Sequence, residues 1–67
     1  MFRIRYSLLK RQRLLKGLTQ EKVAVLAGVS PSTVAKVETG QRGGANVKKI
    51  ADALAVDMED LIMEDVA

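Results

Sequence analysis

The chain of 67 residues has no cysteine, no histidine and no tryptophan, and it has only one proline, one phenylalanine and one tyrosine. Without cysteine no disulfide can stabilise the fold, and without cysteine or histidine the usual soft-ligand metal sites are excluded. Because aromatic side chains are so few, aliphatic packing has to hold the core. A chain this short buries only about 60% of the surface that it exposes when unfolded. The sequence predicts one small domain over residues 1–67.

Long apolar runs are also missing. No segment approaches the roughly 18 apolar residues that a membrane-spanning helix requires, and the basic N-terminus is not followed by an apolar segment with a small-residue cleavage site. We therefore expect a cytoplasmic protein that does not contact a membrane. Histidine- and cysteine-based catalysis is excluded, and Gly43-Gly44 lacks the Lys-Ser/Thr context of a phosphate-binding loop. We expect no enzyme activity and no cofactor.

Each end of the chain is poor in charge of one sign. Residues 1–22 carry seven basic side chains and one acidic side chain, Glu21, whereas residues 50–67 carry six acidic side chains and no basic one. Polyanions would be steered to the basic half and repelled from the acidic half. A solvated surface without a ligand is the alternative, and the charge split alone does not decide between them.

The segment from Gln20 to Thr39 encodes two short helices joined by a tight turn. Thr19 is suited to cap the first helix, and Gly28 is suited to the left-handed position just after its last turn. Ser30 can cap the second helix. Pro31 then occupies the first helical position, where its missing N–H group has no intrahelical partner to lose.

The second helix of this pair has an inward and an outward face. At about 100° per residue, Val34 and Val37 mark the inward face, and Ser32, Thr33 and Lys36 are expected on the opposite side. In the first helix, small Ala24 is expected to face the second helix and to permit close approach. The result is a helix pair with a polar, cationic outer face.

This pattern resembles the Cro and phage-repressor (XRE-like) family of helix-turn-helix transcription regulators. The resemblance extends from about Leu8 to Ile62, and the residues that carry it are Gly17 to Gln20 (GLTQ), Ala24, Gly28-Val29-Ser30 and Glu38-Thr39-Gly40. It implies an all-α fold, a compact five-helix bundle of the lambda-repressor type whose second and third helices form the helix-turn-helix. A helical hairpin with a glycine turn in an unrelated small bundle is the alternative.

Two further helices flank the pair within the bundle predicted over residues 7–63. The first is expected to run from a Ser7 cap to about Lys16 and to be closed by Gly17. The fourth follows a flexible loop at residues 40–45 and is expected to begin at an Asn46 cap. Its core stripe at i, i+3, i+4 and i+7 consists of Val47, Ile50, Ala51 and Leu54.

The C-terminal part predicts a short fifth helix that begins at Asp57. Glu59 and Asp60 lie in its first turn, where the helix dipole favours acidic side chains. Leu61 and Ile62 are expected to turn inward, and residues 64–67 form a tail.

The first six residues show a different pattern. Phe2, Ile4 and Tyr6 alternate with arginines, as in a half-buried strand. An isolated strand needs a partner, and the candidate is the tail, residues 62–66, either within the chain or across a dimer. A frayed N-terminal arm is the alternative.

The second helix of the pair, at about residues 31–39, is the predicted recognition helix, and its outward face is the predicted base-reading surface. In helix-turn-helix proteins this helix enters the major groove with its N-terminal end. Lys36 suits O6 and N7 of guanine, and Ser32 can donate or accept a hydrogen bond. The resemblance implies that the positions matching Pro31, Ser32 and Lys36 reach bases, and Thr33 is a fourth candidate. Because Pro31 offers only an apolar contact and Ser32 is short, DNA shape is expected to contribute.

Phosphate contacts are expected near the ends of the two helices. Gln20 lies at a helix N-terminus, where its amide, the free N–H groups and the helix dipole can face the same anion, and the family resemblance supports this role. Thr19, Thr39 and Arg42 are further candidates. The alternative for Gln20 is a solvated residue at a helix start.

Glu38 is expected to form a structural ion pair. The helical wheel places its carboxylate near the inward side, where an unpaired charge is costly. Arg13 occupies the position where the resembled family carries an arginine that pairs with the glutamate after the recognition helix. The resemblance therefore implies an Arg13–Glu38 pair that ties the first helix to the third.

Four apolar residues are left over from the predicted core, namely Leu8, Leu15, Val25 and Leu26. They could pack under the N-terminal arm, contact a protein partner or lie scattered on the surface. A homodimer is expected, because symmetric operators match two-fold proteins. The sequence thus predicts a DNA-binding regulator, most simply a repressor that occupies an operator. The alternative is a protein-interaction module such as the antitoxin of a toxin–antitoxin pair.

Overall fold

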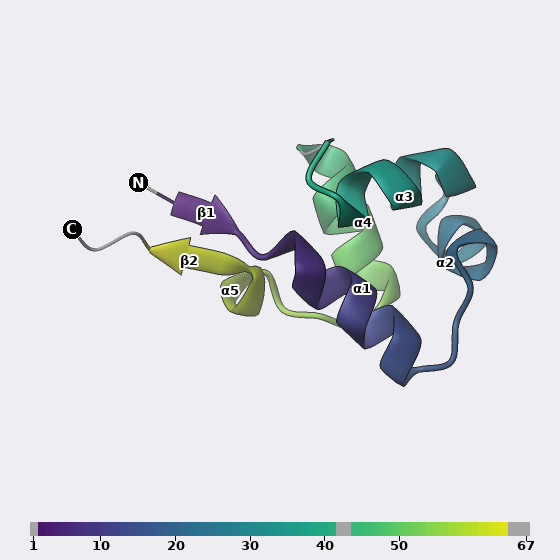
Figure 1. The fold of residues 1–67 in the computed structure, drawn as a ribbon, viewed down its shortest axis with the longest axis horizontal. Helices are drawn as coiled ribbons and strands as arrows, with labels where there is room; N and C mark the ends of the chain where they lie inside the picture. The colour runs from purple at the N-terminus through teal and green to yellow at the C-terminus, as the bar shows by residue number, and fades with distance from the viewer. Residues whose placement is uncertain (1, 42–43, 65–67) are drawn as a thin grey trace.

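The computed structural model describes residues 2–41 and 44–64, and these residues form five helices and two short strands (Figure 1). The elements in chain order are β1 (Phe2–Ile4), α1 (Tyr6–Leu15), α2 (Gln20–Ala27), α3 (Pro31–Glu38), α4 (Ala45–Ala53), α5 (Met58–Leu61) and β2 (Ile62–Glu64). The helices cluster together, and the two strands extend from one end of the cluster beside both termini. The predicted five-helix bundle is confirmed within the described residues.

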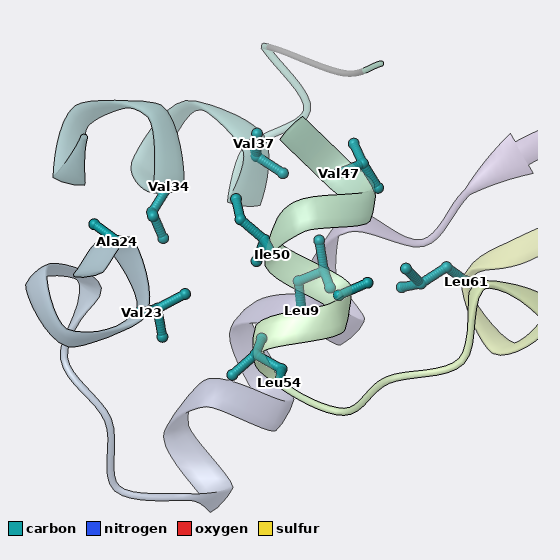
Figure 2. Close-up of a cluster of buried hydrophobic side chains, with 10 residues drawn as sticks. Leu9, Val23, Ala24, Val34, Val37, Val47, Ile50, Leu54 and Leu61 are labelled. Carbon is teal, nitrogen blue, oxygen red and sulfur yellow. The ribbon is translucent and has the colours of Figure 1, made fainter. Parts of the chain in front are cut away.

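Helix α4 supplies the middle of the hydrophobic core. Its predicted stripe is fully or almost fully buried, and α2 packs against both α3 and α4. Figure 2 shows side chains from α1, α2, α3 and the C-terminal part converging on α4. The buried apolar residues are Leu9, Val23, Ala24, Val34, Val37, Val47, Ile50, Ala51, Leu54 and Leu61. Full burial of each larger aliphatic side chain contributes about 1.5–3 kcal/mol of transfer free energy, so this cluster accounts for the fold without aromatic residues.

The ends of α2 and α4 have the same hydrogen-bonding pattern. After α2, Gly28 has a φ of 71°, and the next residue donates its N–H to the carbonyl of Ala24 at 3.0 Å. After α4, Ala55 has a φ of 56°, and Val56 donates its N–H to the carbonyl of Ala51 at 2.8 Å. Both are left-handed terminations that satisfy carbonyls of the last turn. The second uses alanine where glycine is the favoured residue.

Two predicted helix caps were wrong. Ser7 lies inside α1, which begins one residue earlier because Arg5 leaves the strand and accepts the N–H of Leu8 at 3.0 Å. Asn46 lies in the first turn of α4. The cap there is Gly44, whose φ of 67° and ψ of −141° suit glycine, and whose carbonyl accepts the N–H of Val47 at 3.1 Å.

The two ends of the chain pair with each other. Strands β1 and β2 are antiparallel, with Phe2 opposite Glu64 and Ile4 opposite Ile62. The pairing is therefore within one chain, and residues 65 and 66 of the proposed partner segment lie outside the described residues. The inward orientation predicted for Ile62 was wrong: it follows the last residue of α5, adopts an extended backbone and is 40% exposed. Tyr6, predicted to continue the strand pattern, begins α1.

Candidate nucleic-acid interface

Local hydrogen bonds fix both helices of the α2–α3 pair at their N-termini. The Oγ1 atom of Thr19 accepts the N–H of Lys22 at 3.1 Å, and the Oγ atom of Ser30 accepts the N–H of Thr33 at 3.2 Å. Pro31 is the first residue of α3. These are the caps and the proline position that the sequence predicted. Each cap of this kind contributes about 1 kcal/mol to the stability of its helix.

Helix α3 divides into a buried and an exposed face, as the helical wheel predicted. Val34 and Val37 are fully buried against the core, while Pro31, Ser32 and Lys36 are exposed. In Figure 2, Val34 and Val37 point from α3 toward α4. The apolar face therefore holds α3 on the molecule and leaves a face with a hydroxyl and an ammonium group available for a ligand.

Thr33 does not lie on that exposed face, so its predicted outward orientation was wrong. Thr33 is only 9% exposed, and its Oγ1 atom lies 2.9 Å from the Oγ atom of Ser30. The sequence held a signal for this, because position 33 is one helical turn before the buried Val37. Three of the four candidate base contacts, Pro31, Ser32 and Lys36, thus share a surface.

The candidate phosphate ligands differ in what their polar groups already bind. Gln20 is half-buried, and its amide nitrogen donates to the Oε1 atom of Glu38 at 3.1 Å. The hydroxyl of Thr39 lies 3.2 Å from the carbonyl oxygen of Ala35 and 3.1 Å from that of Lys36, so it donates to the last turn of its own helix. Thr19 is exposed. Arg42 lies outside the described residues.

Arg13 and Glu38 lie together, as the resemblance implied, and form a buried pair. The Arg13 Nε atom is 2.7 Å from Glu38 Oε2, and its Nη2 atom is 3.3 Å from Oε1. Arg13 also donates through Nη1 to the carbonyl of Leu18 at 2.9 Å. One side chain of α1 therefore connects the end of α3 with the loop that precedes α2. Sequence reasoning missed the bonds to Leu18 and from Gln20.

The surplus apolar residues do not all lie on the surface. Leu15, Val25 and Leu26 are 69%, 75% and 52% exposed. Leu8, which the sequence grouped with them, instead packs partly buried against the core. Leu14, which was not among the predicted surplus residues, is 58% exposed. The inward face of α1 is formed by Leu9 and Arg13, which are four positions apart. Leu14 follows Arg13 and is turned by about 100° from it, so it lies off that face.

No helix among residues 2–41 and 44–64 is long and apolar enough to cross a membrane. Helix α3 presents an exposed face, the capped helix α2 packs beside it, and the buried Arg13–Glu38 pair holds the end of α3 in place. This arrangement defines a helix-turn-helix domain, of the type that sequence-specific transcription regulators use to bind DNA.

Comparison with known proteins identifies the family. The family model HTH_3, described as helix-turn-helix, matches residues 9–61, and the chain belongs to this family. The chain is 39% identical over 57 residues to RghRB of Bacillus subtilis (strain 168), which is described as an uncharacterized HTH-type transcriptional regulator. That match covers 81% of this chain and 41% of the relative, so the chain spans about two fifths of the length of the relative.

A solved structure has a similar fold. The restriction-modification controller protein C.AhdI from Aeromonas hydrophila superimposes with a TM-score of 0.72 and is 38% identical in sequence. The match covers 82% of this chain and 83% of that protein. The similarity therefore includes the helix-turn-helix and most of the bundle around it.

Proposed function

We propose that this protein is a sequence-specific transcription regulator that represses by occupying an operator, with α3 in the major groove. The observation that carries the proposal is the face of α3, where Pro31, Ser32 and Lys36 are exposed while Val34 and Val37 anchor the helix from behind. The described functions of the two relatives, a transcriptional regulator and a restriction-modification controller, support a role in gene regulation.

In this proposal, base recognition involves two polar side chains and one apolar side chain. Lys36 donates to O6 and N7 of a guanine, Ser32 contacts a base edge one turn earlier, and Pro31 packs on a thymine methyl group. Thr33 takes no part, because its hydroxyl lies against Ser30. Each good contact discriminates against a wrong base by about 1–3 kcal/mol. With so few direct contacts, the shape of the DNA contributes to the choice of site.

Phosphate contacts orient the domain on the duplex. Gln20 and Thr19 lie at the start of α2, and the hydroxyl of Thr19 accepts a backbone N–H while its own hydrogen remains available to donate. Arg42 is proposed from the sequence as a further contact. Thr39 reaches a phosphate as a donor only if its hydroxyl leaves the carbonyls of Ala35 and Lys36.

The proposed active species is a homodimer on a two-fold operator, because one recognition helix reads too few bases to define a site alone. The exposed apolar side chains of Leu14, Leu15, Val25 and Leu26 are available for protein contacts. The protein-interaction alternative has no comparison in its favour.

The proposal is tested by selecting a binding site from a random duplex library and titrating it against a scrambled duplex over a range of salt concentrations. Lys36→Ala is expected to reduce the preference for the selected site by about 5- to 150-fold, equivalent to about 1–3 kcal/mol. The matched control is Lys16→Ala, which removes the same charge from an exposed residue just after α1, outside the α2–α3 pair.

The control variant is expected to retain the preference. An equal loss in both variants would mean that the protein responds to net charge and that α3 does not read bases. Selection that yields no preferred sequence would contradict sequence-specific binding itself.

A further inference from the structure

The carboxylate of Glu38 binds more than its ion-pair partner. Its Oε2 atom accepts from Arg13 Nε at 2.7 Å, and its Oε1 atom accepts both from Arg13 Nη2 at 3.3 Å and from Gln20 Nε2 at 3.1 Å. Arg13 comes from α1, Gln20 from α2 and Glu38 from α3. A single buried carboxylate therefore connects the first residue of α2 to the last residue of the recognition helix.

The bond from Gln20 fixes the direction of its amide group. A glutamine amide has two N–H donors on one nitrogen and a carbonyl oxygen, and without a partner it can rotate so that either end faces a ligand. Because Glu38 accepts one N–H, the nitrogen is held toward the carboxylate, and its second N–H is directed away from it. Gln20 is half-buried, so the side chain reaches both the network and the surface.

Arg13 makes this arrangement compatible with an approaching anion. A lone carboxylate next to Gln20 would repel a phosphate, whereas two guanidinium hydrogen bonds offset its charge. The third bond of Arg13, to the carbonyl of Leu18 at 2.9 Å, also restrains the loop that leads into α2. Both effects act on the position of Gln20.

We propose that Glu38 is a positioning residue for DNA binding, which holds the amide of Gln20 so that its second N–H donates to a phosphate oxygen at a fixed place relative to α3. This inference rests on the proposed function, because it assumes that Gln20 meets the DNA backbone. It adds that the Arg13–Glu38 pair sets the register between the phosphate contact and the base-reading face, beyond its contribution to stability.

The test compares the effect of Gln20→Ala on operator affinity in two backgrounds. One is the natural protein. The other is Arg13→Met with Glu38→Leu, which replaces the buried pair by apolar side chains of similar size, a change that buried ion pairs often tolerate without loss of stability. Affinity is measured below the melting temperature of every variant, as established by circular dichroism.

Gln20→Ala is expected to weaken binding about five- to tenfold in the natural background and less than twofold in the apolar background. An equal effect in both backgrounds would overturn the positioning role while leaving the phosphate contact in place. No effect of Gln20→Ala in the natural background would overturn both this inference and the proposed contact of Gln20. Neither result would contradict base reading by α3, which the comparison of Lys36→Ala with Lys16→Ala tests separately.

A second measurement needs no folded variant. In NMR spectra of the natural protein, the Gln20 side-chain amide is expected to exchange its protons more slowly than the amide of the exposed Gln41, and to shift when the operator is added. Exchange as fast as that of Gln41, or an unchanged Gln20 resonance in the complex, would contradict the inference.

Discussion

Ala55 is the residue whose backbone fits its amino acid least well. Among the described residues it is the only non-glycine with a positive φ, 56°, in a position where α4 ends in a left-handed turn. An alanine in this region clashes with its own backbone at a cost of about 1–2 kcal/mol, which glycine avoids. Part of that gain is offset by the greater freedom of glycine in the unfolded chain.

Ala55→Gly is therefore expected to raise the free energy of unfolding by about 0.5–1 kcal/mol, seen as a melting temperature higher by about 4–8 °C per kcal/mol. The matched control is Ala53→Gly at the last residue of α4, which has a helical backbone, and this variant is expected to be less stable because glycine is unfavourable in a helix. A lower melting temperature for Ala55→Gly would show that the left-handed turn carries no such strain.

The Arg13–Glu38 pair is expected to have a larger effect on stability than Ala55. Arg13→Ala leaves the carboxylate of Glu38 buried without its partner and removes the bond to Leu18, so it is expected to destabilise the fold by about 3–5 kcal/mol. Lys48→Ala, which breaks the exposed Lys48–Asp52 pair, is the control and is expected to cost less than about 1 kcal/mol. Equal melting temperatures for Arg13→Ala and the natural protein would refute the structural role of the pair.

At the scale of the elements, helix ends were predictable wherever one side chain determines them. Thr19, Ser30 with Pro31, and Gly28 set the ends of α2 and the start of α3 through local hydrogen bonds and φ preferences, and the structure has them there. Ser7 and Asn46 belong to residue types that cap helices equally well, but the surrounding chain starts both helices before these residues. The chain enters α1 from a paired strand, and Gly44 caps α4 two residues before Asn46.

Two serines of the α3 region are expected to separate stability from recognition. Ser30→Ala removes the cap of α3 and the contact with Thr33, and is expected to cost about 0.5–2 kcal/mol of stability. Ser32→Ala, on the exposed face, is expected to leave the free energy of unfolding within about 0.5 kcal/mol of that of the natural protein. It should instead reduce the preference for the selected operator in a competition titration. Loss of stability in Ser32→Ala, or none in Ser30→Ala, would contradict the assigned faces.

At the scale of the whole molecule, the chain closes on itself. The β1–β2 ladder joins both ends next to α5, and Arg5 adds a bond from its N–H to the carbonyl of Leu61 at 2.8 Å. The alternation of Phe2, Ile4 and Tyr6 predicted a strand with the tail as its partner, but the local pattern left open whether the two pair within one chain or across a dimer. Long-range pairing depends on the bundle bringing the two ends together, and sequence spacing does not encode that directly.

The same limit applies to the candidate site. The exposed face of α3 follows from helical period alone, so Pro31, Ser32 and Lys36 were identifiable from the sequence. The outward orientation predicted for Thr33 was wrong, because position 33 lies one helical turn before the buried Val37 and so falls at the edge of the inward face. The bond from Gln20 to Glu38 joins residues 18 positions apart. Predicting it would require knowing how α2 and α3 pack against each other.

The most direct measurement for the central claim is NMR mapping of backbone amide shifts when the selected operator is added to the protein. The account predicts the largest shifts at Ser32 and Lys36 on α3 and at Thr19 and Gln20 around the start of α2, with little change along α5. Shifts concentrated on α5 and the β1–β2 ladder, with the amides of α3 unchanged, would contradict it.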